Sequence, residues 1–410
     1  MITVETAHAL IRNSIPAPRV TAVAAADAAG WVVAKDIPAP FPLPRFDNSA
    51  MDGFAVRWED TRTARDDHPV ALKQTGTVPA GIAPSMRVGP GECAQVMTGA
   101  PIPPGADAVV MVEYTSGFAG NGVVKIKRPV RKGENIRFAG EETGAGEVVV
   151  PAGKRVGAAE LGVLAAFGIE QVQAYRRPRL AILVTGSELK KAGETLTEGE
   201  IYNSNLPLLR ELARLAGGEV VVAGAVPDDP VSLRGFLEKG FESCDILVCS
   251  GGVSAGRFDL VRTVFKQLGV KESFHKVAQK PGKPLTFGTM KRILVFGLPG
   301  NPVSAFVCFM EYVWPACERW MGLEPQPKIS AVLEAGFPRD PRMHRFLPGS
   351  VRMKGGKLLA SPSRKVGSHM LTSAVGANAI LESPPGNGPL DEGETVLVNL
   401  LPWKSITGKP

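Results

Sequence analysis

The stretch from residue 246 to residue 259 places several chemically active groups within a short length of chain. It begins with an apolar run that lacks polar alternation, which is typical of a strand buried on both faces. The glycines that follow let backbone N–H groups approach a ligand closely, and a turn of this kind can bind an anion. Ser250, Ser254 and Asp259 add two hydroxyls and a carboxylate. These groups suit a phosphorylated ligand with a divalent cation, although an ordinary glycine-rich connection accounts for the stretch equally well.

Apolar runs of strand length alternate with segments of helical periodicity from residue 178 onward, which predicts a doubly wound, mainly parallel α/β sheet. Asn301 is expected to cap the last helix, with Pro302 in its first turn. The expected strands are residues 180–184, 220–223, 246–249 and 293–296, and the other expected helices are 205–216, 230–239 and 258–268.

The carboxyl ends of parallel strands lie along one edge of such a sheet, and ligands bind in the crevice there. Three of the loops at this edge contain an acid, so we expect Glu188, Asp228 and Asp259 to form one site. The expected ligand-binding residues of the same loops are Thr185, Gly186, Ser187, Ser250, Gly251, Gly252, Ser254, Pro299, Gly300, Asn301 and Ser304.

Three lysines, Lys276, Lys280 and Lys283, lie in a segment rich in proline and glycine. Because this segment leads into a strand that ends at the crevice, its ammonium groups are candidates to bind phosphate or another oxyanion. The alternative is a solvated basic loop, which is the usual interpretation of a run of like charges.

The rest of the chain divides into smaller domains. A helix over residues 4–13 with Thr3 as its cap belongs to a discontinuous N-terminal linker domain, predicted at 1–45 and 141–175. Short β-type runs between glycine and proline turns predict an inserted small β domain over 46–140, which contains Asp52 in a polar turn. The α/β domain is predicted at 176–325, and a C-terminal β-barrel at 326–410. On local sequence alone, Asp52 is more simply an aspartate that bonds its own turn.

Composition is that of an ordinary globular protein, with 44% hydrophobic and 21% charged residues. The net charge of +7 favours anionic small molecules, and without a basic stripe carrying aromatics we expect no nucleic acid partner. Five cysteines without metal-ligand spacing fit a reducing compartment. No apolar run approaches the length of a membrane span, so no membrane partner is expected and the cytoplasm is the expected location.

Six sequence blocks, taken together, resemble the molybdopterin molybdenumtransferase family, whose eukaryotic relatives include gephyrin. The resemblance covers essentially the whole chain, and the blocks occur in the family's order. They are residues 47–53 (DNSAMDG), 98–101 (TGAP), 133–137 (GENIR), 185–189 (TGSEL), 250–254 (SGGVS) and 297–304 (GLPGNPVS).

This resemblance implies four domains per subunit, a homodimer, and insertion of molybdate into adenylylated molybdopterin with release of AMP, assisted by Mg²⁺. It implies active-site roles for Asp52, Glu188, Asp228 and Asp259, and positions Lys276 and Lys280 near the ligand. Glu188, Asp228 and Asp259 are then the expected metal ligands, since Mg²⁺ prefers oxygen donors. The active site would be shared between subunits, with Asp52 of one chain facing the acidic crevice of the other.

Two positions depart from the family pattern, because Glu142 and Asn203 stand where aspartate is usual. Two other activities also stay open at this point. One is adenylylation of molybdopterin by a similar α/β domain, which the additional β domains and the Asp52 block argue against. The other is a scaffold protein without catalysis, which the intact acidic loops argue against.

Overall fold

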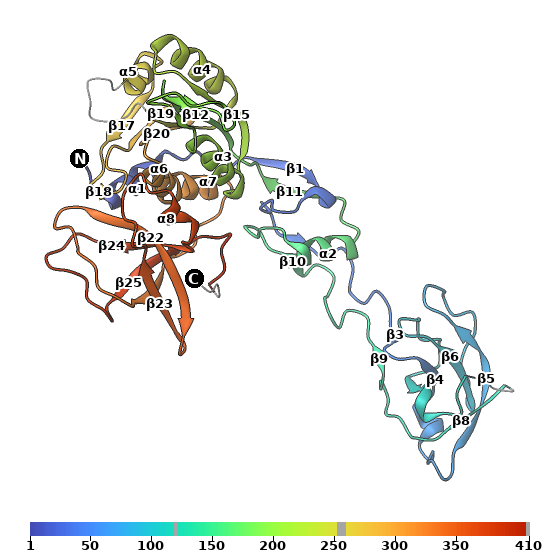
Figure 1. Ribbon diagram of the computed structural model, residues 1–410. Coiled ribbons are helices and arrows are strands. Elements are labelled where there is room, and N and C mark those ends of the chain that lie inside the picture. The colour runs from blue at the N-terminus through green and yellow to red at the C-terminus, as the bar shows by residue number, and fades with distance from the viewer. Residues whose placement is uncertain (119–121, 252–259, 407–410) are drawn as a thin grey trace. The chain divides into compact units, whose positions relative to one another are not determined.

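The computed structural model describes residues 1–118, 122–251 and 260–406, and it divides into two compact units (Figure 1). Unit 1 consists of Met1–Ala34, Arg155–Gly157 and Gln173–Pro410, and unit 2 consists of Lys35–Lys154 and Ala158–Val172. Within the described residues, no helix is long and apolar enough to cross a lipid bilayer.

A six-stranded sheet in the order β15-β12-β16-β20-β19-β17 is the centre of unit 1. The first four strands are parallel, whereas β19 is antiparallel to β20 and β17 is antiparallel to β19. The strands are β12 (Arg179–Thr185), β15 (Glu219–Val226), β16 (Ile246–Ser250), β17 (Lys271–His275), β19 (Thr286–Met290) and β20 (Ile293–Leu298).

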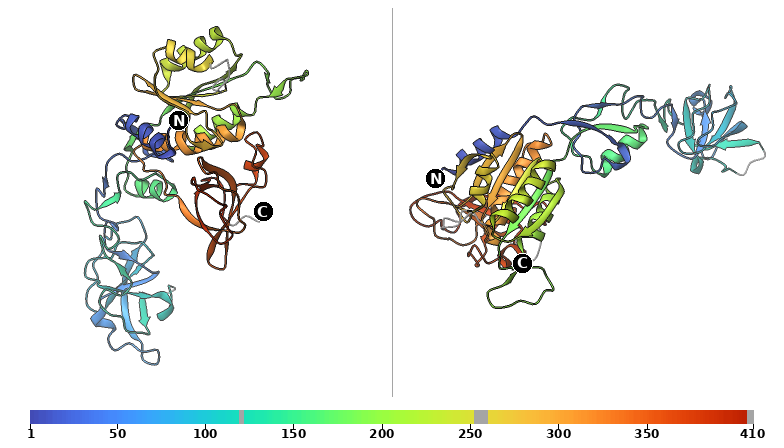
Figure 2. Two further views of the ribbon diagram at one scale, coloured as in Figure 1. Left: turned by 90° about the vertical axis from the view of Figure 1, so that its left-hand side faces the viewer. Right: turned by 90° about the horizontal axis from the view of Figure 1, so that it is seen from above.

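Helices cover both faces of this sheet (Figure 2). Along β12, Leu180, Ile182 and Val184 pack into one apolar core, while Ala181 and Leu183 pack into the other. The doubly wound, mainly parallel fold expected from the sequence is confirmed. The first core contains α1 (Val4–Ser14), α3 (Asn205–Leu215), α6 (Pro302–Cys308) and α7 (Trp314–Trp320); the second contains α4 (Pro230–Ser243) and α5 (Leu260–Gln267).

The antiparallel strands β17 and β19 were not expected from the sequence. Phe287 of β19 is fully buried, and its ring lies 5.7 Å from that of Phe274 and 5.0 Å from that of Phe296. Gly288 lets β19 approach β17, because a Cβ there would lie 2.6 Å from the carbonyl oxygen of Lys271. These long-range contacts hold together two segments whose local sequence has no strong strand pattern.

The C-terminal β-barrel expected from the sequence is confirmed. Five strands pair in the order β22-β23-β21-β25-β24, and a further pairing of β22 with β24 closes the ring. The short strand β18 (Gln279–Lys280) adds to β22 in parallel and so joins the lysine segment to the barrel. The barrel strands are β21 (Ile329–Leu333), β22 (His344–Lys354), β23 (Lys357–Pro362), β24 (Ala379–Ser383) and β25 (Thr395–Leu400), with α8 (Thr372–Val375) beside them.

Unit 2 contains the expected inserted β domain, a five-stranded sheet in the order β7-β4-β6-β5-β8. The chain enters and leaves it through β2 (Ile37–Pro38) and β10 (Val148–Val150), which pair with each other. Phe167, which follows α2 (Ala158–Ala166), packs with its ring 5.4 Å from that of Phe41. The sheet strands are β4 (Gly53–Val56), β5 (Val70–Val78), β6 (Glu92–Val96), β7 (Ala108–Met111) and β8 (Val123–Ile126).

Short pairings complete the structure. They join β1 (Val20–Ala24) with β11 (Gln171–Tyr175), β3 (Asn48–Ser49) with β9 (Ile136–Arg137), and β13 (Leu189–Lys190) with β14 (Ile201–Tyr202). The residue boundaries predicted above for the four domains stay predictions.

The N-terminal helix α1 begins as expected, with the Thr3 hydroxyl accepting a hydrogen bond from the Thr6 N–H. Its partly buried His8 stacks on Tyr312, with the ring centroids 4.8 Å apart. Burial lowers the pKa of His8 to about 4, with Lys328 and Arg319 acting in the same direction and Glu311 and Glu5 opposing them. His8 is therefore neutral in the folded protein at neutral pH.

Because the folded-state pKa of His8 lies below its ordinary value of about 6.5, the unfolded chain binds the additional proton. Its contribution to stability is complete above about pH 6.5 and is lost as the pH falls toward 4. We expect the wild type to lose a few kcal/mol of unfolding free energy between pH 6.5 and pH 4 through His8. His8→Phe, which keeps a ring against Tyr312, should remove this loss in urea unfolding curves. His68→Phe, which replaces an exposed histidine of unit 2, is the control. If the unfolding free energy of His8→Phe changed with pH as steeply as that of the wild type, the lowered pKa of His8 would be contradicted.

Candidate active site

The register of the central sheet brings four strand ends to one level. Thr185 of β12 pairs with Val226 of β15, and Ser250 of β16 pairs with Val184 on one side and Leu298 on the other. The loops that follow these strands are therefore neighbours along the carboxyl edge, where α/β sheets bind ligands. We call this edge the crevice.

A pair of acids lies at the end of β12. The buried Thr185 hydroxyl donates a hydrogen bond to Oδ1 of Asp228, and the Asp228 N–H donates to Oγ of Ser187 at 3.2 Å. The exposed Glu188 folds back over Gly186, where an added Cβ would lie 2.8 Å from both of its carboxylate oxygens. The structure thus gathers Glu188 and Asp228 around the turn 185–188.

The adjacent aspartate has a different role. Asp229 is the N-cap of α4, and its Oδ1 accepts hydrogen bonds from the N–H groups of Val231 (3.0 Å) and Ser232 (2.9 Å). Hydrogen bonds from Ser232 lower the pKa of Asp229. Asp228 therefore bonds the end of β12, whereas the adjacent Asp229 stabilises the start of α4.

Asn205 joins the end of β16 to the loop after β20 and was not proposed as a site residue from the sequence. Its buried Nδ2 donates to Oγ of Ser250 (3.0 Å) and to the carbonyl oxygen of Gly300 (2.7 Å). The Ser250 hydroxyl in turn donates to the carbonyl oxygen of Pro299 at 3.0 Å. Among the residues that the structure describes, Oδ1 of Asn205 is buried without a hydrogen-bond partner. A polar residue at the first turn of a helix was the only local signal.

The turn after β16 needs glycine at position 251. Gly251 has φ +103°, and a Cβ there would lie 2.3 Å from the carbonyl oxygen of Thr185. Three of the site residues proposed from the sequence, Gly252, Ser254 and Asp259, lie outside the described residues.

The expected side-chain cap by Asn301 is not present. Asn301 stands at the N-cap position of α6, but its Nδ2 donates to Oγ of Ser368 (2.9 Å), a residue of the C-terminal barrel region. The carbonyl oxygen of Ser368 accepts from the N–H of Val303 at 3.0 Å and so satisfies a donor of the first helical turn. Ser304 is buried within α6.

Lys276 follows the end of β17 at the same edge of the sheet, since His275 pairs with Thr286 and Thr286 pairs with Gly297. It has a left-handed backbone, with φ +74°, and its carbonyl oxygen accepts from the Ile2 N–H at 3.2 Å. Lys280 is exposed on β18, where it pairs with Arg345 of the barrel. The crevice edge thus includes Lys276, whereas Lys280 lies on the strand that joins the barrel.

Asp52 lies in unit 2, where it is exposed. Its Oδ1 accepts hydrogen bonds from the backbone N–H (2.6 Å) and hydroxyl (2.9 Å) of Thr98, which lower its pKa. The carboxylate is therefore bound to a distant loop and not to its own turn. This contact joins two of the six sequence blocks, residues 47–53 and 98–101.

The two positions that depart from the family pattern differ in their surroundings. Glu142 is exposed in unit 2. Asn203 accepts a hydrogen bond at Oδ1 from the Leu206 N–H (3.0 Å), so its side chain caps the start of α3.

The described crevice residues fit a hard divalent cation by donor type. Asp228 and Glu188 supply carboxylate oxygens, and Thr185 and Ser187 supply hydroxyls, which are donors that Mg²⁺ accepts. Among the described residues, no three His, Cys, Asp or Glu side chains come together as a metal site.

Three protein-family models match the chain in succession. The MoeA N-terminal region (domain I and II) matches residues 2–168, a probable molybdopterin binding domain matches 181–319, and the MoeA C-terminal region (domain IV) matches 330–401. A solved structure of the molybdopterin biosynthesis MoeA protein from Pyrococcus horikoshii superposes with a TM-score of 0.82 at 35% identity. That match covers 98% of this chain and 99% of the other.

Curated relatives agree over nearly the full length. The molybdopterin molybdenumtransferase of Bacillus subtilis is 36% identical over 94% of this chain and 92% of its own length. Molybdopterin molybdenumtransferase 2 of Mycobacterium tuberculosis is 36% identical over 94% of this chain and 96% of its own. Because matches of this identity extend over all domains in the same order, the chain belongs to the molybdopterin molybdenumtransferase family.

Proposed function

We propose that this chain is a transferase of molybdenum cofactor biosynthesis, which inserts molybdate into adenylylated molybdopterin and releases AMP. The observation that carries the proposal is the crevice at the end of β12, where Asp228 and Glu188 surround a turn beside the buried ends of β16 and β20. The MoeA N-terminal and C-terminal regions on either side of the α/β domain support this activity over adenylylation by an α/β domain alone.

Release of AMP requires that charge on the pyrophosphate bridge be neutralised and that the attacking oxygen be oriented. Mg²⁺ held by Asp228 and Glu188, together with Asp259, would supply the positive charge. The Thr185 hydroxyl fixes one Asp228 oxygen, which leaves the other oxygen for the cation. Asn205 holds the loops after β16 and β20 together and so positions the backbone that borders the ligand.

Molybdate is itself an oxyanion, so carboxylates repel it, and cations or N–H groups must bind it. Lys276 at the crevice edge is the best placed basic side chain, and Lys280 is the second candidate.

The homodimer is inferred from the family resemblance, and the cytoplasmic location is inferred from the thiols. We infer a homodimer in which Asp52 of one chain completes the crevice of the other. The cytoplasm suits the protein because all five cysteines are buried thiols, and burial raises the pKa of Cys93 and Cys244 to about 12.

Incubation with adenylylated molybdopterin and molybdate should release AMP, and reactions without molybdate or Mg²⁺ are the controls. Failure to release AMP under complete conditions would refute the proposal.

Substitution of the two adjacent aspartates separates catalysis from helix capping. We expect Asp228→Asn, which keeps the shape of the side chain and removes its charge, to lower kcat/KM for AMP release by at least about a hundredfold. Asp229→Asn should leave the rate within about threefold of wild type, because asparagine caps a helix as well as aspartate. Equal effects of the two substitutions would mean that Asp228 acts only through the fold.

The basic side chain at the crevice edge should govern the use of molybdate. We expect Lys276→Gln to raise the KM for molybdate about tenfold at low ionic strength, with a smaller effect at high salt because salt screens the attraction. Lys283→Gln removes the same charge from an exposed position of the same segment and serves as the control. A KM for Lys276→Gln that equals that of the control would place molybdate elsewhere.

A shared site predicts complementation between inactive dimers. When Asp52→Ala and Asp228→Asn homodimers exchange subunits, each heterodimer contains one crevice without either substitution. Random pairing makes half of the dimers hybrid, so about a quarter of the wild-type activity should return. Each variant incubated alone is the control. Verified heterodimers without activity would assign Asp52 to the crevice of its own chain.

A further inference from the structure

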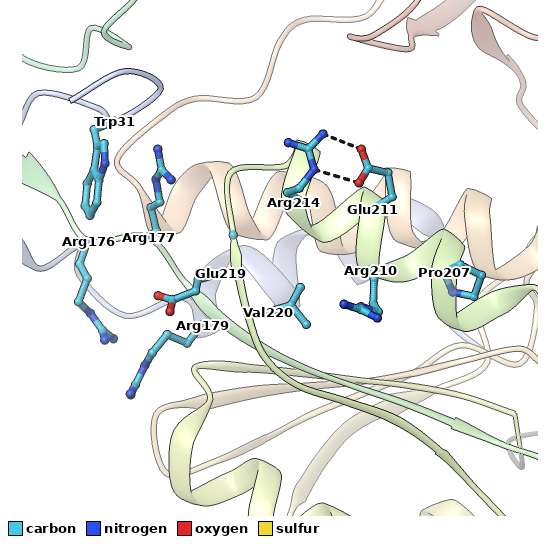
Figure 3. A pocket seen from close by; sticks show the side chains of 11 residues that line it. Trp31, Arg176, Arg177, Arg179, Pro207, Arg210, Glu211, Arg214, Glu219 and Val220 are labelled. Carbon is cyan, nitrogen blue, oxygen red and sulfur yellow. Dashed lines mark hydrogen bonds and ion pairs between the residues drawn. The ribbon is translucent and has the colours of Figure 1, made fainter. Parts of the chain in front are cut away.

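A pocket of about 650 Å³ lies at the edge of the central sheet where β12 and β15 begin, opposite the crevice. Arg179 and Glu219, the first residues of β12 and β15, pair with each other in its wall. Trp31, Arg176 and Arg177 line one side, and Arg210 and Arg214 of α3 line the other (Figure 3). Six residue steps separate Arg179 from Thr185 along β12, so the pocket lies about 20 Å from the crevice.

The lining of this pocket is strongly cationic. Five arginines line it against two glutamates, Glu211 and Glu219. The Glu211 carboxylate accepts two hydrogen bonds from Arg214, at 2.9 and 2.7 Å. Asp245, which is not among the lining residues, accepts a hydrogen bond from Arg176 at 2.7 Å and lies 3.5 Å from Nε of Arg179. Positive charge still exceeds negative charge after all three acids are counted.

Several guanidinium donors in the pocket have no protein acceptor. The Arg210 side chain makes no hydrogen bond or ion pair with any described residue. The Nε atoms of Arg176 and Arg177 are buried without a hydrogen-bond partner in the described structure, and that of Arg179 has only the 3.5 Å contact with Asp245. Buried donors without acceptors are rare in folded proteins, and guanidinium groups bind phosphate and carboxylate groups through paired hydrogen bonds.

An aromatic ring adjoins these donors. The guanidinium of Arg177 lies over the Trp31 ring, 4.6 Å from its centroid. Burial lowers the pKa of Arg177, and the nearby Arg155 lowers it further, so an anion in the pocket would offset the cost of this buried charge. A planar cation on an indole forms a flat, partly buried surface suited to a planar ring.

We propose that this pocket binds a nucleoside monophosphate, with the phosphate at the arginines of α3 and of the segment before β12, and the base beside Trp31. The volume lies within the range of small-molecule sites. The site is distinct from the crevice and does not depend on the proposed reaction, although AMP is a product of that reaction.

Calorimetric titration of the full chain tests the proposal with three probes: AMP, inorganic phosphate and adenosine. AMP should bind more tightly than either fragment, because only AMP carries both the anion and the ring. Arg210→Gln should weaken AMP about tenfold, because it removes a charge-assisted hydrogen bond. Trp31→Leu should weaken the binding of AMP and leave the binding of phosphate unchanged.

Matched variants distinguish binding in this pocket from binding in the crevice or at any exposed arginine. Arg292→Gln removes an exposed arginine of the same domain outside the pocket and should not change AMP binding. Asp228→Asn alters the crevice and should leave this AMP site intact. Circular dichroism of Arg210→Gln checks the fold, which this exposed position should not disturb.

The proposal is overturned if wild type does not bind AMP, if Arg210→Gln behaves as Arg292→Gln does, or if only Asp228→Asn abolishes binding. Phosphate that binds as tightly as AMP would overturn the nucleoside assignment.

Discussion

Burial of β12 and β16 on both faces is the constraint on which the rest of unit 1 depends. Leu180 to Val184 are at most 2% exposed and alternate between two cores, so each core fixes half of the strand. Polar residues limit the strand at its ends, with Arg179 at the start and Thr185 at the close. A slip of one residue would move Arg179 or Thr185 out of place and exchange the two faces. The crevice exists because this register leaves four strand ends level.

The same physics explains how much of the fold could be predicted from sequence. Continuous apolar runs indicated β12, β16 and β20 to within two residues at each end, because strands buried on both faces need no alternation. The strands β17 and β19 were missed because their sequences KESFH and TFGTM mix polar and apolar residues, and long-range contacts such as those of Phe287 with distant rings order them. The local sequence gives little sign of β22 because Pro348 and Gly349 interrupt it, although long-range pairing with β23 and β24 continues through both residues.

Prediction of the candidate site had a similar limit. The acid loops could be placed at one edge because strand direction alone brings Glu188 and Asp228 there. The role of Asn205 could not, because its two partners lie 45 and 95 residues away in the chain. Asn301 was assigned to a local cap on the same local reasoning, but a serine 67 residues away takes its side chain. Asp52 likewise bonds Thr98, across 46 residues, which a turn-based interpretation cannot anticipate.

The helix α3 reaches both the crevice and the arginine pocket, which raises the question of whether the two are coupled. Asn205 in its first turn holds the crevice loops, and Arg210 and Arg214 line the pocket from later turns. Coupling would require α3 to have two arrangements. Its opposite face, with Leu209, Leu212 and Ala213 at most 2% exposed, is packed into the first core, so a shift of the helix would open that core. Close packing resists such a shift, because each lost contact has no replacement. An anion at Arg210 should therefore bind by reorienting exposed side chains over a fixed helix, and the two sites should act independently.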